Sequence, residues 1–230
     1  ALALALAVPA SAQSQADFKF VAGSGQVAFG VQVGTYKAEL DGKGIDVWCV
    51  DFMNHISPGN RFTVNATKLD GTVGLGTTRF GSTKGLASYQ QAAWLAAQFR
   101  TTAVAQWGFI HAAIWHLMTP NSPYVTLPSD IAAVQGWTNL SAANYQKYVY
   151  NNVYVLTDVA VAGCAGARPT RGPWNGCGKQ EQLYIRGDLT LAPEPATMGL
   201  LATGLVGLGG ATFLRRRRQL AALPLGEPLE

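Results

Sequence analysis

The sequence predicts a β-rich α+β fold: a β-sandwich or barrel-like body with a two-helix insert, followed by a C-terminal transmembrane helix. In residues 27–33 apolar side chains alternate with small or polar ones, which is the period of a half-buried strand. Between residues 84 and 118 they recur instead at helical spacing. Residues 196–214 contain no charged side chain and are long enough to span a bilayer. Strands that are followed by helices and then by further strands are typical of an α+β domain.

The first twelve residues are expected to be the remnant of a secretory signal peptide. Residues 1–8 form an apolar Ala/Leu run, and Ala10 and Ala12 supply the small-x-small pattern that a signal peptidase accepts. Pro9 and the Ser/Gln run after it suit a cleavage site better than an ordinary N-terminal helix. We therefore expect cleavage after Ala12, which leaves residues 13–192 as one exported domain.

The first half of this domain is expected to consist of strands. Residues 18–40 are interpreted as two strands, and the Asp-Gly-Lys-Gly sequence at 41–44 as the turn that follows. Residues 45–52 are apolar on both faces, which is typical of a central strand, with Cys49 in its middle. Residues 61–74 are interpreted as a further edge strand with a turn.

Two helices are expected next, over residues 84–99 and 103–118, because apolar side chains share one face in each. Hydroxyl residues that can cap a helix precede both stretches. The candidate N-caps are Ser82 or Thr83 for the first helix and Thr101 or Thr102 for the second. Two weaker helical stretches are expected to begin at Ser129 and Ser141, and closing strands are expected at residues 153–161 and 181–192.

The charge pattern of the exported domain argues against nucleic-acid binding. Residues 13–192 contain 13 Lys and Arg against 10 Asp and Glu, so the basic pI owes much to the arginines at 215–218. No basic patch with interleaved aromatic residues appears. The sequence also lacks a Gly-rich phosphate loop, a Ser nucleophile elbow and a metal-ligand cluster, and His111 and His116 are five positions apart rather than four. We therefore expect no cofactor and no nucleic-acid partner.

The three cysteines are expected to divide into one disulfide and one free thiol. Export leads to an oxidising compartment, in which a disulfide persists. Cys164 and Cys177 flank a loop rich in Gly, Pro and Arg, where a cross-link would stabilise the fold by about 3 kcal/mol in the chain-entropy model. Cys49 then remains unpaired, as either a buried inert thiol or a reactive one.

The C-terminal stretch has three parts: a Pro-Glu-Pro tripeptide, the uncharged residues 196–214 and an arginine cluster. As a helix the uncharged part would measure about 28 Å, close to the thickness of the bilayer core. The arginines are expected to stay cytoplasmic, which leaves the domain outside. This pattern, residues 193–218, resembles the PEP-CTERM sorting signal of Gram-negative bacteria. The residues that match it are Pro193, Glu194, Pro195, Arg215, Arg216, Arg217 and Arg218.

The resemblance implies recognition by an exosortase, a membrane enzyme similar to a transpeptidase. Signal peptidase would remove the N-terminal segment, and the exosortase would cut near the tripeptide. The protein would lie in the inner membrane transiently and then at the cell surface or in the extracellular matrix of a biofilm, where exopolysaccharide is a candidate partner. Residues 219–230 continue beyond the arginines, and the pattern assigns them no role.

The exported domain has a second resemblance, over residues 45–118. The stretches Trp-Cys-Val-Asp-Phe, Ala-Ala-Trp-Leu-Ala and Ala-Ile-Trp follow one another in the order seen in thioester-domain proteins. In that family a Cys and a Gln side chain condense, lose ammonia and form an internal thioester that captures amines. Cys49 matches the Cys, but His111 stands at the Gln position, and imidazole has no acyl carbon. The resemblance therefore implies the scaffold without its covalent chemistry.

Two roles remain open for Cys49 and His111. A thiol beside an imidazole can become a thiolate nucleophile, which would suit a surface enzyme or a covalent adhesin. Alternatively, Cys49 is packed against aromatic residues and His111 is hydrogen-bonded in the core, the usual state of a single His on an apolar helix face. This second role predicts a non-enzymatic surface or matrix protein that binds polymer or protein. A body that only fills the matrix is a third alternative.

Overall fold

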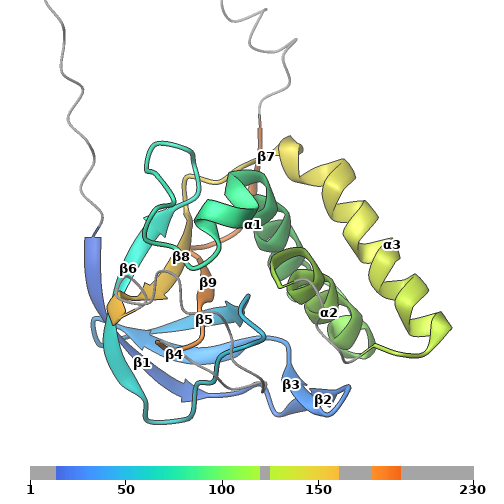
Figure 1. The fold of residues 1–230 in the computed structure, drawn as a ribbon, viewed down its shortest axis with the longest axis horizontal. Coiled ribbons are helices and arrows are strands. Elements are labelled where there is room, and N and C mark those ends of the chain that lie inside the picture. The colour runs from blue at the N-terminus through green and yellow to red at the C-terminus, as the bar shows by residue number, and fades with distance from the viewer. Residues whose placement is uncertain (1–13, 120–124, 161–177, 193–230) are drawn as a thin grey trace, which may run out of the picture. The chain divides into compact units, whose positions relative to one another are not determined.

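The computed structural model describes residues 14–119, 125–160 and 178–192, in which six strands form a closed barrel (Figure 1). Around the barrel the order is β1-β4-β5-β9-β8-β6, and the neighbouring strands are antiparallel. The barrel strands are β1 (Ser14–Ala22), β4 (Tyr36–Leu40), β5 (Lys43–Cys49), β6 (Arg61–Lys68), β8 (Val153–Asp158) and β9 (Gln182–Ile185). The β-rich α+β prediction is confirmed, and of the two expected architectures the body has the barrel.

The segment between β1 and β4 forms a short hairpin that the sequence pattern did not predict. β2 (Gln26–Ala28) pairs with β3 (Val31–Val33), so residues 18–40 contribute to four strands and not to two. Gly25 and Gly30 have positive φ angles of 75° and 77°, a conformation that glycine adopts readily. These glycines turn the chain where the alternation of side chains alone suggests that it continues straight.

The last three residues of β5 are buried on both faces of the strand, as predicted for a central strand. Val47 and Cys49 face the barrel interior with Phe18 and Val64, while Trp48 packs against the helices. Cys49 is the last residue of β5 and not its middle, which corrects the expected position. The apolar run continues past Cys49 into a turn, and apolarity alone does not distinguish such a turn from a strand.

Strand β6 was expected at an edge but lies between β1 and β8, so this prediction was wrong. β6 contains the polar residues Asn65 and Thr67, and both are buried. Thr77 Oγ1, in the segment that follows β6, lies 3.3 Å from Thr67 Oγ1. The closing strands expected at the end of the domain are confirmed as β8 and β9.

The two expected helices are confirmed as α1 (Gly81–Gln98) and α2 (Trp107–Met118), but neither has a side-chain cap. Thr83 Oγ1 instead donates to the carbonyl of Phe80 at 3.2 Å. A 3-10 turn at Val104–Gln106 precedes α2 and moves its start beyond the expected caps. The N-caps predicted at Ser82 or Thr83 and at Thr101 or Thr102 are therefore wrong.

A third helix, α3 (Pro128–Asn144), confirms the weaker helical stretch expected to begin at Ser129, and the described insert therefore holds three helices rather than two. Ser141, expected to begin a helix, lies inside α3 and donates to the carbonyl of Thr138 at 2.7 Å. Beyond α3 the chain forms the short strand β7 (Tyr148–Val149), which pairs with β10 (Thr190–Leu191). The second weak helical stretch therefore comprises the end of α3, a 3-10 turn at Tyr145–Lys147 and the strand β7.

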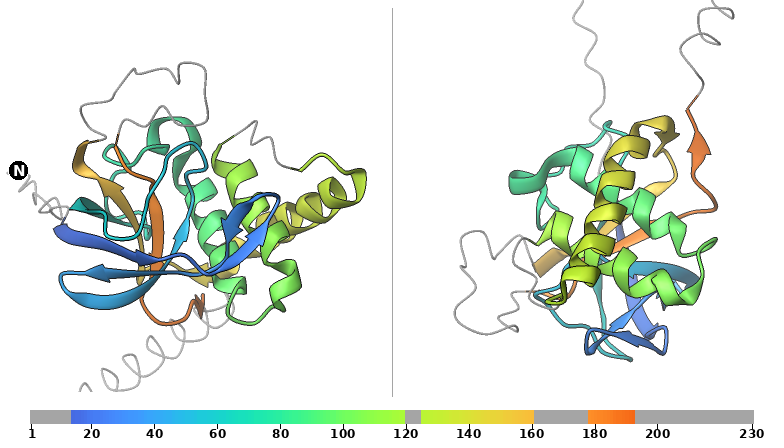
Figure 2. Two further views of the ribbon diagram at one scale, coloured as in Figure 1. Left: turned by 90° about the horizontal axis from the view of Figure 1, so that it is seen from below. Right: turned by 90° about the vertical axis from the view of Figure 1, so that its right-hand side faces the viewer.

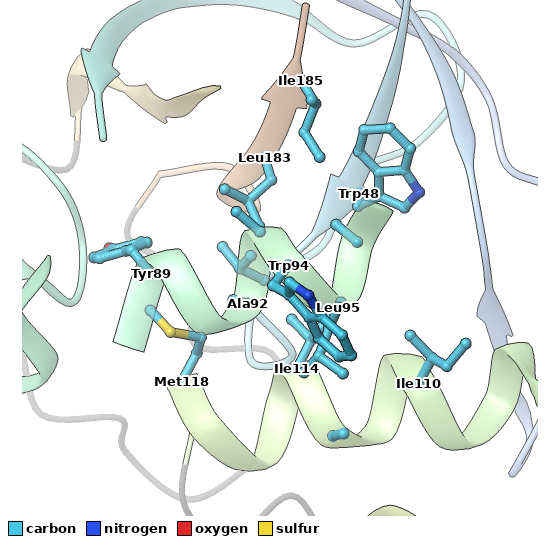
Figure 3. Packing of buried hydrophobic residues seen from close by; sticks show 14 of the residues in the cluster. Trp48, Tyr89, Ala92, Trp94, Leu95, Ile110, Ile114, Met118, Leu183 and Ile185 are labelled. Carbon is cyan, nitrogen blue, oxygen red and sulfur yellow. The ribbon is translucent and has the colours of Figure 1, made fainter. Parts of the chain in front are cut away.

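The helices lie together on one side of the barrel, as both further views show (Figure 2). Side chains from α1, α2, β5 and β9 converge in the core between the two layers (Figure 3). Trp94 and Leu95 of α1 meet Ile110 and Ile114 of α2 there, and Leu183 of β9 closes the cluster. This layer holds the first half of α2 against the end of β5, where Cys49 and His111 lie.

Several predictions fall on residues that the structure does not describe. They are the signal-peptide remnant at 1–12, the bridge between Cys164 and Cys177, the sorting signal at 193–218 and its transmembrane helix at 196–214. Among the described residues, no helix combines the length and the apolar character needed to cross a membrane.

Candidate functional site

The structure brings Cys49 and His111 together, but through a backbone carbonyl and not through the sulfur. His111 Nε2 lies 3.0 Å from the carbonyl oxygen of Cys49. On the other side of the ring, the backbone N–H of Gly34 donates to His111 Nδ1 at 2.9 Å. Since Nδ1 accepts a hydrogen bond, the ring proton belongs on Nε2, which then donates to the carbonyl.

The surroundings of His111 keep its imidazole neutral. The side chain is wholly buried, and this burial lowers its pKa from 6.5 to about 3. Its ring stacks on Trp115 at 4.4 Å between centroids, and the ring of Phe99 meets it edge-on at 5.4 Å. With both nitrogens hydrogen-bonded to backbone, this imidazole has no free site at which to accept a proton from a thiol.

The thiol of Cys49 is also enclosed. The residue has no exposed surface, and its Sγ donates to the carbonyl oxygen of Asp51 at 3.2 Å. Burial, and then the nearby Asp51 carboxylate, raise the pKa of the thiol well above its usual value. A thiol in this state is protonated at neutral pH and out of reach of a substrate, which is unlike the activated cysteines of enzymes.

A buried cluster of charged groups, which the sequence did not reveal, lies beside this pair. Arg79 Nε lies 2.7 Å from Asp51 Oδ2, and the backbone N–H of Arg79 donates to Glu181 Oε1 at 2.7 Å. Glu181 also accepts hydrogen bonds from the hydroxyls of Thr157, at 2.6 Å, and Tyr89, at 2.7 Å. Both carboxylates are fully buried. We call these residues the acid–arginine cluster.

The acid–arginine cluster joins the barrel to the helices. Asp51 follows β5, Arg79 precedes α1, and Glu181 precedes β9. Burial raises the pKa of Glu181 to about 7 and raises that of Asp51 as well, although Arg79 opposes the change at Asp51. These residues are separated by many positions in the chain, so no local motif could have predicted that they meet.

A cavity of about 360 Å³ lies at the end of the barrel near Cys49. Aromatic and amide side chains are among those that line it. The lining residues that matter here are Phe20, Tyr36, Phe52, Asn54, Trp115 and Gln180. Each of the four aromatic residues is at most 5% exposed, so they offer little ring surface to a ligand. These rings also cover the Cys49–His111 pair.

A second cavity, of about 370 Å³, lies at the opposite end of the barrel, where β1, β5 and β8 begin. We call it the barrel-mouth cavity. Its polar rim includes Tyr154, Tyr184, Lys43 and Arg186. None of these residues was a predicted site residue, although the closing strands that hold three of them were predicted.

Comparisons of the chain with known protein families, with curated proteins and with solved structures found no match. Within residues 14–119, 125–160 and 178–192, no group of three His, Cys, Asp or Glu side chains is placed to hold a metal ion. The candidate sites are therefore the enclosed Cys49–His111 pair and the two cavities at the ends of the barrel.

Proposed function

We propose that this chain is an exported protein of the cell surface or extracellular matrix whose barrel domain has a non-enzymatic binding or structural role. The hydrogen bonding of His111 supports the non-enzymatic part most directly. Both ring nitrogens are bonded to backbone groups, and the thiol of Cys49 donates to a carbonyl. A nucleophile and a base that are paired for catalysis would instead bond to each other.

Sorting is the other half of the proposal and rests on the sequence alone. The Pro-Glu-Pro tripeptide, the uncharged stretch and the arginine cluster support recognition by an exosortase. Before that step the chain is held in the inner membrane, and afterwards the barrel domain is released or attached outside the cell. Exopolysaccharide or another surface polymer is then the candidate partner.

The test is the intact mass of the protein recovered from its own bacterium, measured before and after reduction. We expect a chain that begins at Gln13, ends near Pro195 and gains two protons on reduction, because Cys164 and Cys177 are bridged. A mass that retains residues 196–230 would overturn the sorting step and indicate an anchored protein.

This measurement needs one control. Cleavage after Ala12 exposes Gln13 as the N-terminal residue, and its α-amine can attack its own side-chain amide to give a lactam and release ammonia. A thioester at Cys49 would also cost one ammonia. Methylamine separates the two, because it opens and labels a thioester but leaves the lactam intact. Uptake of methylamine as an amide on the acyl partner, together with release of a free thiol at Cys49, would contradict the non-enzymatic role.

The alternative is a surface enzyme or covalent adhesin that uses Cys49, with or without His111. The variant Cys49→Ser removes the thiol while keeping a small polar side chain at this position. Our proposal expects surface attachment to be unchanged apart from effects on stability. Loss of attachment in a variant that still folds would favour the alternative.

A further inference from the structure

The barrel-mouth cavity is a well whose bottom is closed by the barrel core. All six barrel strands or the turns beside them contribute to its lining. Its lower wall is apolar and includes Leu40, Ile45 and Leu156. Below it, Phe18 and Val64 are almost wholly buried and fill the barrel. A ligand of limited size could therefore enter from the mouth and rest on an apolar surface.

Two tyrosines stand side by side on one wall of this cavity. Tyr154 of β8 and Tyr184 of β9 are direct cross-strand partners, and their rings stack at 6.0 Å with an angle of 25°. Leu156 is two residues from Tyr154 and faces the barrel interior, so the tyrosines share its inward side. Both are partly exposed. They present an aromatic surface with phenol hydroxyls to the cavity.

Two cations flank the tyrosines on rigid backbone. Lys43 follows the turn at Asp41, whose backbone N–H donates to the carbonyl of Asp17 at 2.8 Å and whose Oδ1 accepts the N–H of Asp17 at 2.9 Å. Arg186 follows β9, and its N–H donates to the carbonyl of Asn152 at 2.9 Å. The side-chain amide of Asn152 donates back to the carbonyl of Arg186, also at 2.9 Å.

These cations differ from most of their neighbours on the barrel surface. Lys19, Lys37, Arg61 and Lys68 each form an ion pair with a carboxylate. No such pair involves Lys43 or Arg186 among the residues that the structure describes. Asp41 is the acidic residue in the described lining, and one of its oxygens already accepts a backbone N–H. The rim therefore carries a net positive charge that faces the cavity.

We propose that the barrel-mouth cavity binds a carboxylate-bearing sugar ring, such as a uronic acid unit of an acidic polysaccharide. The carboxylate meets Lys43 and Arg186, because charge-assisted hydrogen bonds to Lys and Arg are the strong ones in such sites. The apolar face of the ring lies on Tyr154 and Tyr184, and the ring hydroxyls meet their phenol groups. The volume lies near the lower end of the range for ligand sites, about 300–1,000 Å³.

This inference rests on the proposed surface or matrix role, which brings the protein into contact with polysaccharide. Its test is a calorimetric titration of the processed, exported protein with three probes: galacturonic acid, a galacturonate trimer and a neutral galactose trimer. We expect the galacturonate trimer to bind and the neutral trimer to bind about tenfold or more weakly, since the latter lacks the carboxylate. If galacturonic acid binds but the galacturonate trimer does not, the proposal that the ligand is a polymer is wrong.

The matched variants are Lys43→Gln with Arg186→Gln, and Lys19→Gln with Lys37→Gln as the control. Both remove two exposed cations, but only the first pair lines the barrel-mouth cavity. We expect the first double variant to weaken galacturonate binding about tenfold or more and the control to change it less than about twofold. If both double variants lose the same affinity for galacturonate, the proposed site is wrong, because net charge alone would then explain the binding.

Failure of this inference can be told apart from failure of the proposed function. If the mass measurement finds export and trimming but neither trimer binds, the ligand assignment falls while the exported role stands. If the mass retains residues 196–230 while galacturonate still binds at Lys43 and Arg186, the sorting proposal falls and the site stands.

Discussion

At the scale of single residues, the imidazole of His111 ties together parts of the chain that are distant in sequence. Its two hydrogen bonds join the turn at Gly34 to the end of β5 at Cys49. Through the resemblance to thioester domains, the sequence predicted that His111 lies near Cys49. It could not predict which atoms meet, because that depends on the rotation of α2 and on where β5 ends.

The first residue-scale prediction concerns the thiol of Cys49. At neutral pH we expect a disulfide-exchange reagent to label it slowly in the native protein and rapidly after unfolding in guanidinium, since burial keeps it protonated and enclosed. The time course of absorbance after reagent is added measures this. Rapid labelling of the native protein at neutral pH would show that Cys49 is reactive.

The second residue-scale prediction concerns pH and stability. Burial lowers the pKa of His111 from 6.5 to about 3, so its stabilising contribution is present above pH 6.5 and is lost as the pH falls. Burial raises the pKa of Glu181 from 4.5 to about 7, so its contribution is present below pH 4.5 and is lost as the pH rises. Between these limits the two groups have opposite effects on the free energy of unfolding.

Two variants separate these effects. Relative to the parent protein between about pH 4.5 and 6.5, Glu181→Gln should make stability rise with pH by about 1.4 kcal/mol per unit. The variant His111→Asn should change the slope by a similar amount in the opposite sense. Guanidinium unfolding at several pH values measures both slopes, and slopes that match the parent's would contradict the assigned protonation states.

At the scale of secondary-structure elements, helical periodicity predicted α1 and α2, and a stretch that is apolar on both faces predicted β5. The errors arose where turns and strand pairing decide the structure. Glycines with positive φ divided residues 18–40 into four strands. The place of β6 between β1 and β8 depends on pairing with strands that are distant in the sequence. The barrel-mouth cavity could not be predicted either, because Tyr154 and Tyr184 meet only through the register of two strands that are far apart in the chain.

The element-scale prediction concerns the connection between the β2–β3 hairpin and β4. Gly34 has a φ of 101°, and a Cβ at this position would lie 2.4 Å from the ring of Trp107. We expect Gly34→Ala to lower the free energy of unfolding by about 2 kcal/mol or more, through backbone strain and displacement of that ring. Guanidinium unfolding measures the change.

Gly44→Ala in β5 is the matched control. A Cβ at Gly44 would meet no atom within 4 Å, and its backbone does not require a positive φ. We expect a change within about 0.5 kcal/mol for this variant. Similar losses in the two variants would show that Gly34 has no special role.

At the scale of the whole domain, the acid–arginine cluster holds the barrel and the helical layer together. We expect Arg79→Ala to lower the free energy of unfolding by about 3–5 kcal/mol, because it leaves the buried Asp51 carboxylate without its cation. Arg61→Ala removes an arginine from the exposed pair with Asp17 and should change the free energy of unfolding much less, because solvent screens such a pair. A small loss at Arg79 would show that the two layers associate without this charge pairing.

The closed ring of strands also bears on how this protein behaves when many copies are crowded together. Each of the six barrel strands is hydrogen-bonded to a neighbour on both sides, so none offers an unpaired edge to the barrel of another molecule. Proteins with open sheets use such edges to add strands from other copies and grow into fibres. Copies of this domain would therefore not join through the strands of their barrels, and the strands paired on one side only belong to the short sheets β2–β3 and β10–β7 in the part that the structure describes.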